Sequence, residues 1–204
     1  MPRISRVSTS KRNAAKSFLE FDNGEKLALP TELLLRFALH KDLEITPERV
    51  VTLVEAAQEI AAYEKALELL SFRDHSTFEL IGKLRQRGYS EALSTKICER
   101  LAQKGYINDI EYARKFARYL QQEKRYSQAA VRAKLLQKGI FGNLLAEAEN
   151  QLSRELEEAN CRYLAAKKMK GYGDDQRKQK AAAFLNQKGF HWELIKKILD
   201  EDGD

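Results

Sequence analysis

The sequence predicts a mainly α-helical protein, with three tandem three-helix repeats in an elongated array behind a small N-terminal β-hairpin or sheet and a short helix. The first observation is a recurring five-residue phrase at Leu84–Gly88, Leu135–Gly139 and Leu185–Gly189, whose glycines are 51 and 50 residues apart. Three copies in register at such a period indicate an internal repeat. The second is that helical apolar patterns fill the chain between the phrases. The third is that strand and turn signals lie only in the first 30 residues.

Each phrase is expected to end a helix. A basic residue in the last turn suits the negative end of the helix, and glycine just beyond it can adopt the left-handed conformation without a Cβ clash. We therefore expect Gly88, Gly139 and Gly189 to be structural caps with no functional role of their own. Another helix should begin within a few residues, with Ser90 as its N-cap in the first copy and Asn143 in the second.

Composition favours an acidic partner. The 204 residues are 43% hydrophobic and 32% charged, with a net charge of +6 and a pI near 9.2, which fits nucleic acid or an acidic protein surface. Cys98 and Cys161 lie in helical patterns and are expected to be buried and reduced. No run approaches a membrane-spanning length, and no secretory signal stands at the N-terminus, so we expect a cytoplasmic protein without membrane contact.

The N-terminal part carries the strand signals. Two strands, Lys16–Phe21 and Glu25–Leu29, flank an Asp-Asn-Gly turn, and an earlier segment can add a third strand. The short helix expected after Pro30 should cover them, because an isolated hairpin is marginally stable. Residues 1–60 hold nine basic and nine acidic residues, so the positive surplus lies in residues 61–204.

Helices account for the rest of the chain. Thr46 and Pro47 predict the start of a long helix that ends near Phe72, and Ser76 with Glu79 forms a capping box for the next helix. From residue 143 to residue 170 the sequence predicts either one long helix or two that meet near 155–160. The expected domains are 1–45 (hairpin and short helix), 46–107 (long helix and first repeat), 108–158 (second repeat) and 159–204 (third repeat with an acidic tail).

Positive charge is concentrated in three blocks. Residues 83–104 hold six basic and two acidic residues, residues 114–138 hold eight and one, and residues 162–180 hold seven and two. Such a block is commonly only a solvated helix face. Because these blocks recur at the repeat period, a stacked array would carry them along one side as a stripe suited to a phosphate-lined or acidic groove.

Catalysis finds little support in the sequence. The three histidines lie in unrelated segments without a second ligand at helical spacing, and no glycine-rich phosphate loop follows a strand. The adjacent acids Glu157 and Glu158 point in different directions on a helix, so they do not form a carboxylate dyad. We therefore expect a protein that is not an enzyme and that needs neither a metal nor a cofactor.

Several motifs between residues 60 and 200 belong together. They are Ala66-Leu67-Glu68-Leu69-Leu70, Arg73-Asp74-His75-Ser76, Glu79-Leu80, Lys83-Leu84, Gly88, Leu101, Gly105-Tyr106-Ile107-Asn108-Asp109, Tyr112-Ala113, Lys134-Leu135 and Lys138-Gly139-Ile140. Taken together, these motifs resemble the RecX family of recombination regulators. The third repeat departs most from the pattern, since Phe184 stands where the first two repeats have Lys83 and Lys134, and Asn108 replaces a common acidic residue.

The resemblance implies a regulator that binds the RecA recombinase and its single-stranded-DNA filament and inhibits ATPase, strand-exchange and coprotease activities, with direct, weak DNA binding in some members. We expect a monomer whose basic face meets the filament. The residues predicted for this face are Arg85, Arg87, Arg114, Arg118, Lys124, Arg125, Arg132, Lys134 and Lys138. Two alternatives stay open, a helical-repeat protein that acts on nucleic acid alone and a scaffold for an unrelated protein; salt-sensitive DNA binding or a pull-down would distinguish them.

Overall fold

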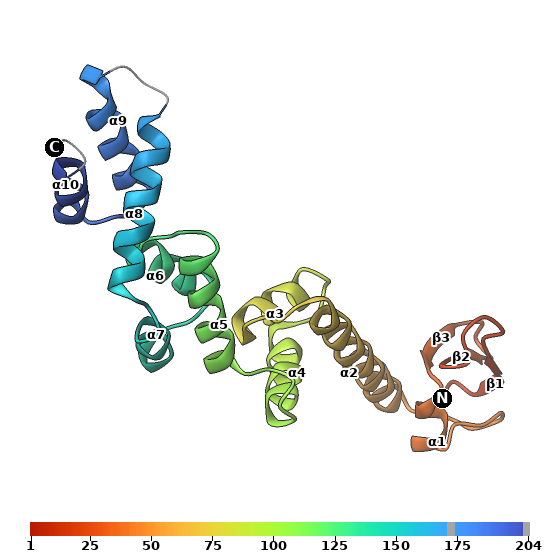
Figure 1. Ribbon diagram of the computed structural model, residues 1–204. Coiled ribbons are helices and arrows are strands. Elements are labelled where there is room, and N and C mark those ends of the chain that lie inside the picture. The colour runs from red at the N-terminus through yellow and green to blue at the C-terminus, as the bar shows by residue number, and fades with distance from the viewer. Residues whose placement is uncertain (171–173, 202–204) are drawn as a thin grey trace. The chain divides into compact units, whose positions relative to one another are not determined.

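The computed structural model describes residues 1–170 and 174–201 (Figure 1). The chain divides into two compact units: residues 1–73 with 81–100, and residues 74–80 with the chain from 101 onward. The described elements are β1 (Ile4–Thr9), β2 (Lys16–Phe21), β3 (Lys26–Pro30), α1 (Glu32–Arg36), α2 (Pro47–Phe72), α3 (Thr77–Arg85), α4 (Glu91–Gln103), α5 (Asp109–Gln122), α6 (Gln128–Gln137), α7 (Gly142–Glu149), α8 (Arg154–Met169), α9 (Asp174–Gln187) and α10 (Trp192–Glu201). None of the described helices is long and apolar enough to cross a membrane.

The N-terminal sheet confirms the predicted hairpin and its third strand. The strands are antiparallel in the order β1-β2-β3, and Gly24 takes a φ of +84° in the turn between β2 and β3. One face of the sheet packs on a core that includes Leu19, Leu29 and Leu33. The cover is wider than the short helix predicted for it, because α1 ends at Arg36 and the first turns of α2 complete the core.

The long helix α2 begins and ends as predicted. The Thr46 side chain accepts a hydrogen bond from the backbone N–H of Arg49, and Pro47 is the first helical residue. The Arg49 guanidinium donates to the carbonyl of Phe37 at 2.7 Å, which fixes the end of α1 against α2. Thr46 and Pro47 were sufficient to predict the start of α2, because both act within the first turn of the helix.

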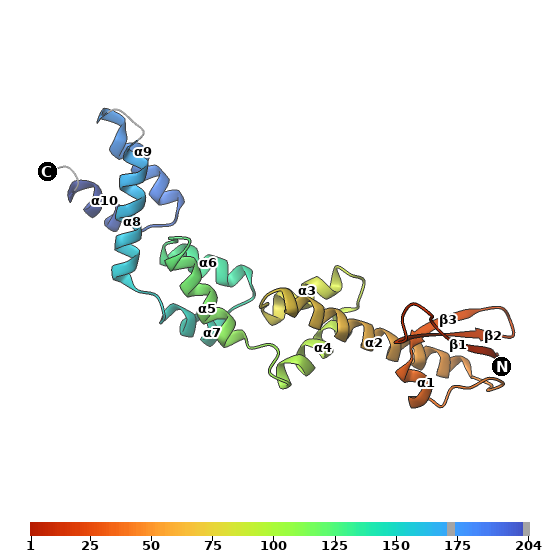
Figure 2. The same cartoon turned by 45° about the vertical axis from the view of Figure 1, so that its right-hand side comes forward.

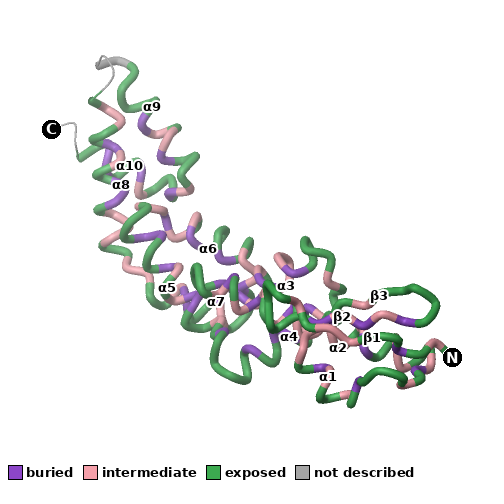
Figure 3. Tube along the Cα trace, turned by 90° about the vertical axis from the view of Figure 1, so that its right-hand side faces the viewer, coloured by how far each residue is buried: buried purple, intermediate pink, exposed green. Residues whose placement is uncertain are grey.

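Repeats two and three are each a three-helix unit with its own core. Repeat two comprises α5, α6 and α7, and repeat three comprises α8, α9 and α10 (Figure 2). Along α5, buried residues alternate with exposed ones at helical spacing (Figure 3). Asn108 and Ser127 cap α5 and α6 through their side-chain oxygens, as their sequence positions indicate.

Two details of the prediction between residues 141 and 170 are wrong. Asn143 is not an N-cap, because α7 already begins at Gly142 and Phe141 is the residue before it. The chain breaks between α7 and α8 at residues 150–153, before the predicted meeting point at 155–160. The break has two causes: Ser153 caps α8 by accepting from the Leu156 N–H, and the buried Gln121 amide bonds both the N–H and the carbonyl of Ser153.

Successive repeats are joined by the same backbone contact. The buried N-cap Ser76 donates its hydroxyl to the carbonyl of Lys138 at 2.6 Å, and Ser127 donates to the carbonyl of Lys188 at 3.0 Å. In both junctions an N-cap serine of one repeat thus bonds the last residue of the recurring phrase before its glycine in the next repeat. Each bond satisfies a carbonyl at the C-terminal end of a helix, which has no partner within its own helix.

A second contact repeats at the same junctions. The N–H of the first residue of the helix donates to a carboxylate of the next repeat, from Thr77 to Asp109 at 2.8 Å and from Gln128 to Glu157 at 2.8 Å. These N–H groups lie at the positive end of a helix, where a carboxylate is the favoured partner. Each junction therefore consists of a helix N-terminus received by a carboxylate and a carbonyl.

The recurring glycines serve these junctions as well as capping helices. Gly88, Gly139 and Gly189 all have left-handed φ values, of +89°, +75° and +82°, as the prediction required. A Cβ at Gly139 would overlap the Cβ and Cγ of Phe78, and one at Gly189 would lie 2.9 Å from the Ser127 hydroxyl, whereas one at Gly88 would meet open space. Gly139 and Gly189 thus also allow the preceding repeat to approach closely, which the sequence alone did not predict.

Candidate partner-binding surface

Helix α5 presents the first group of predicted contact residues. Its core face buries Tyr112, Ala113, Ala117 and Leu120 at helical spacing. Arg114 and Arg118 are one turn apart on the remaining side, where i and i+4 residues are neighbours. Tyr112 and Phe116 stack with ring centroids 5.6 Å apart, and both pack into the core of the repeat, which sets the face of α5 opposite to its basic side chains.

Two of the predicted cations in repeat two are held by carboxylates of that repeat. Arg114 lies 3.1 Å from Glu111 and 2.9 Å from Glu147, and these partners raise the pKa of its guanidinium. Arg132 lies 2.6 Å from Glu149 of α7. The side chains of these pairs are 31–53% exposed, so each pair contributes little to stability, and both arginines remain accessible to a partner that offers stronger anions.

Lys138 and Arg125 instead take part in the repeat junctions. The Lys138 ammonium is 2.8 Å from Glu79, in a pair whose side chains are only 30% and 14% exposed. Arg125 has a left-handed φ of +55°, donates to the side-chain oxygen of Asn160 at 3.4 Å, and lies 4.0 Å from the centroid of the Tyr163 ring. Both residues stabilise the array, and a partner that engaged them would compete with these contacts.

Three predicted residues of the second repeat have no carboxylate partner among the residues that the structure describes. Arg118 is exposed on α5. Lys124 follows α5 with its ammonium 5.3 Å from the centroid of the Tyr119 ring, and the hydrogen bond that this ammonium donates to the Tyr119 side chain raises the pKa of the lysine. Lys134 is exposed on α6 and donates only to the neutral side chain of Gln137. These three cations are the ones most available for an anionic or acidic surface.

The two predicted residues of repeat one lie in the first compact unit. Arg85 is paired with Glu91 at 3.5 Å, and Arg87 donates to the carbonyl of Lys83 at 3.0 Å. Both side chains are exposed. They remain predictions for the same basic face.

The structure adds an aromatic and basic cluster in repeat three that the sequence reasoning set aside. The half-buried Phe184 ring has the ammonium of Lys168 at 5.2 Å and that of Lys188 at 5.6 Å from its centroid. Phe184 stands where the other repeats have lysine, and for this reason the predicted basic face included no residue of the third repeat. The dense positive charge of residues 162–180 was the signal for it.

Comparison with known proteins links each repeat to a described domain. Residues 62–101 match the first three-helix domain of RecX, residues 108–148 match its second, and residues 156–199 match its third. The matched segments cover the helices of the three repeats and leave the N-terminal sheet outside.

Similar proteins agree with these matches. A regulatory protein RecX of Chlorobium limicola is 35% identical over 145 residues, which are 69% of this chain and 87% of the relative. One from Clostridioides difficile is 27% identical over 201 residues, covering 97% of this chain and 94% of the relative. A crystal structure of a regulatory protein RecX has the same fold, with a TM-score of 0.73 and 24% identity over 98% of this chain and all of that one. RecX from Lactobacillus salivarius superposes with a TM-score of 0.62 at 25% identity, over 72% of this chain and 97% of that one.

Proposed function

The chain belongs to the RecX family, and from that premise we propose that it is a non-enzymatic regulator of the RecA recombinase. It binds RecA and the single-stranded-DNA filament that RecA forms, and lowers the ATPase, strand-exchange and coprotease activities of that filament. Its relatives are named regulatory proteins, which supports a regulatory role. The action would take place in the cytoplasm, where recombination intermediates form.

The observation that carries the proposal is the availability of basic side chains in repeat two. Arg118, Lys124 and Lys134 are exposed and have no carboxylate partner in the described ranges, while Arg114 and Arg132 are held by partly exposed ion pairs. Exposed cations steer an acidic partner, and those without a carboxylate partner contribute to its affinity with no ion pair to break. We place these five residues at the centre of the contact.

The test is single-stranded-DNA-dependent ATP hydrolysis by RecA, with this protein titrated in well below one per RecA protomer. We expect inhibition by the native chain and its loss in the triple variant Arg118→Glu, Lys124→Glu and Lys134→Glu. None of the three side chains takes part in a described junction, so the thermal unfolding of the variant should match that of the native protein.

A matched control changes the same amount of charge elsewhere. Arg6, Lys11 and Arg12 belong to the electrically neutral N-terminal part and can be reversed to glutamate together. We expect this control variant to inhibit as the native chain does. Full inhibition by the folded repeat-two variant, or equal loss in both variants, would contradict the proposed contact.

The Phe184 cluster favours a second candidate function, direct binding of single-stranded DNA. A ring with two lysines beside it offers phosphate contacts next to an aromatic surface, and such pairs recur in sequence-tolerant single-strand binding. In this case binding to bare DNA would weaken steeply with salt and would be lost in Lys168→Glu with Lys188→Glu. RecA inhibition that survives this double variant would separate the two functions.

A further inference from the structure

In both repeat junctions, the same kinds of groups bind the N-terminus of a helix from the preceding repeat, and we call these groups the receiving surface. In repeats two and three it consists of a side-chain oxygen at the start of the first helix and a backbone carbonyl and glycine at the end of the second. Asp109 with Lys138 and Gly139 forms it in repeat two, and Glu157 with Lys188 and Gly189 forms it in repeat three. In both cases the bound element is the N-terminus of a helix with a serine cap.

Repeat one carries the same surface at equivalent positions. Gly88 precedes Gly139 by 51 residues, and the same offset relates Gln58 to Asp109. The 51-residue offset relates structurally equivalent positions of repeats one and two, because it also pairs residues that are buried in both repeats. These pairs are Ala62 with Ala113, Ala66 with Ala117, and Leu69 with Leu120. Gln58 offers an amide oxygen in place of the carboxylate, and the Arg87 carbonyl is the equivalent of the Lys138 carbonyl.

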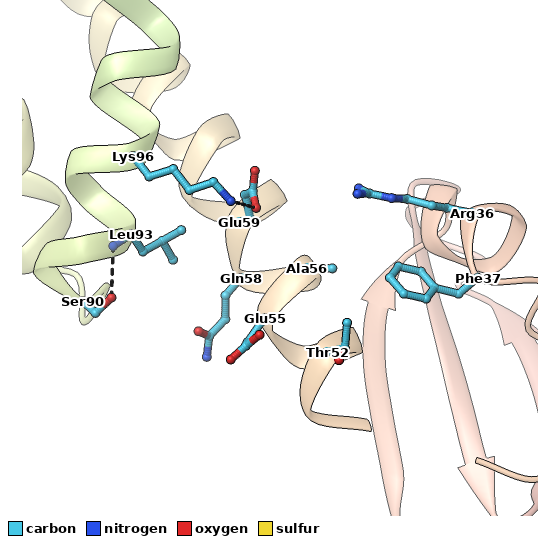
Figure 4. Close-up of a pocket in the computed structure, with 10 residues that line it drawn as sticks. All are labelled: Arg36, Phe37, Thr52, Glu55, Ala56, Gln58, Glu59, Ser90, Leu93 and Lys96. Atoms are coloured by element: carbon cyan, nitrogen blue, oxygen red, sulfur yellow. Dashed lines mark hydrogen bonds and ion pairs between the residues drawn. The ribbon is translucent and has the colours of Figure 1, made fainter. Parts of the chain in front are cut away.

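This surface of repeat one is open. Gln58, Arg87 and Gly88 are exposed, and a Cβ placed on Gly88 would have no heavy atom within 4 Å. A cleft of about 440 Å³ adjoins it at Gln58 and at Ser90, which follows Gly88 by two residues, and is lined by residues of α1, α2 and α4 within the same compact unit. Gln58 and Glu55 project from α2 between Ser90 on one side and Arg36 and Phe37 on the other (Figure 4).

The charges of the cleft suit a helix N-terminus. Such an end carries partial positive charge and several N–H groups without intrahelical partners. Glu55 is exposed and adds a carboxylate beside Gln58, while Glu59 is held by Lys96 at 2.7 Å. The cleft lining sets Glu55 and Glu59 against Arg36 and Lys96, so it has no excess of positive charge to attract a phosphate backbone, and a protein segment is the better occupant.

We propose that repeat one binds, in trans, the N-terminus of an α-helix of a partner protein that begins with a Ser-x-x-Glu or Thr-x-x-Glu capping sequence. Its cap hydroxyl donates to the Arg87 carbonyl, and the first N–H of the helix donates to the Gln58 side-chain oxygen. Its glutamate meets the Arg87 guanidinium, as Glu79 meets Lys138 within the chain at 2.8 Å. The residues of this site differ from the basic residues of repeat two, and the proposal stands or falls independently of RecA binding.

The probe is a helical peptide with the sequence of residues 74–85, stapled between the positions of Ile81 and Arg85, which take no part in the described junction. It is added to the full-length ¹⁵N-labelled chain, whose own α3 stays in place. We expect amide shifts at Arg87, Gly88 and Tyr89 and at the Gln58 side chain. Replacing the cap serine of the peptide by alanine should weaken binding about five- to tenfold, the loss expected for one or two hydrogen bonds.

Variants of the chain complete the test. Gln58→Lys puts a positive charge against the helix end, and we expect it to weaken binding about tenfold or more, whereas Gln103→Lys, an exposed change on α4, should have no effect. Arg87→Glu should also weaken binding, and a peptide with lysine in place of its glutamate should recover it. Shifts confined to Asp109 and Lys138, indifference to Gln58→Lys and Arg87→Glu, or self-association of the chain that the peptide inhibits would each overturn the proposal.

Discussion

Replacing Gly139 by alanine should destabilise the protein more than the same change at Gly88, although both glycines cap equivalent helices. Their φ values, +75° and +89°, are both in the left-handed region. The conformational cost of a Cβ there is about 1–2 kcal/mol at either position. At Gly88 this is the whole cost, because the added atom would meet open space.

At Gly139 a steric term is added. The new Cβ would overlap the Cβ and Cγ of Phe78, so the start of α3 must move away from repeat two. Overpacking of this kind costs about 1–3 kcal/mol. If the junction opens instead, the bond from Ser76 to the Lys138 carbonyl is lost, at about 1 kcal/mol or more for a buried pair. Either route places the total for Gly139→Ala at about 2–5 kcal/mol.

Urea unfolding followed by circular dichroism measures both variants, and hydrogen exchange at the Thr77 amide reports on the junction itself. That N–H donates to Asp109 in the intact junction, so its exchange should accelerate in Gly139→Ala and stay slow in Gly88→Ala. Losses of stability that agree within about 0.5 kcal/mol, the scatter of surface substitutions, would refute the steric reasoning.

A cycle with Phe78 identifies the atoms responsible. Because the overlap includes the Cβ as well as the Cγ of Phe78, the background Phe78→Ala should relieve only part of the excess cost of Gly139→Ala. The background Phe78→Gly removes that Cβ and should lower the excess, after its own cost of about 1 kcal/mol is subtracted. If Phe78→Ala removes the whole excess cost of Gly139→Ala, the Phe78 ring, and not the close approach of the backbones, determines the packing at the junction.

Three further predictions concern buried polar groups and a thiol. Ser127→Ala should cost about 2–3 kcal/mol in urea unfolding, because it removes a helix cap and a junction bond, whereas Ser90→Ala, a cap only, should cost about 1 kcal/mol. Asn160→Ala should cost about 1–3 kcal/mol, because the fully buried Asn160 amide donates to the carbonyl of Gln121 at 2.8 Å. Burial, with a smaller effect of nearby carboxylates, raises the pKa of the Cys161 thiol from 9.0 to about 12. The unfolded thiol therefore ionises first, and its share of the stability is complete below pH 9 and is lost as pH rises toward 12. Cys161→Ala should show a shallower loss of stability than the native chain above about pH 9, and a thiol reagent should label Cys161 only on unfolding.

Local signals in the sequence predicted much of the fold. The Asn-Gly turn, the Thr46-Pro47 helix start and the glycine that ends each recurring phrase act over two to four residues, and the structure has all of them. The break before α8 was placed too late because its cause is not local. Gln121, 32 residues away, holds the backbone of Ser153 with two hydrogen bonds, and no pattern within residues 143–170 encodes that contact.

The basic face could be predicted only as a set of residues. A run of positive charge does not say which side chains meet carboxylates, because those carboxylates lie on other helices: Glu147 and Glu149 on α7 for Arg114 and Arg132, and Glu79 on α3 for Lys138. The structure separates the predicted cations into those held inside the second unit and those left for a partner. The contact itself remains a prediction.

The recurring phrase is explained by its backbone more than by its side chains. The basic residue before the glycine is used differently in each copy. Arg87 turns back to a carbonyl of its own helix, Lys138 pairs with Glu79, and Lys188 lies beside Phe184. The carbonyl of that residue and the left-handed glycine after it are used alike in the second and third copies, each receiving a serine-capped helix. A repeat of this kind keeps the sequence positions that join one unit to the next, and its exposed side chains are free to diverge toward a partner.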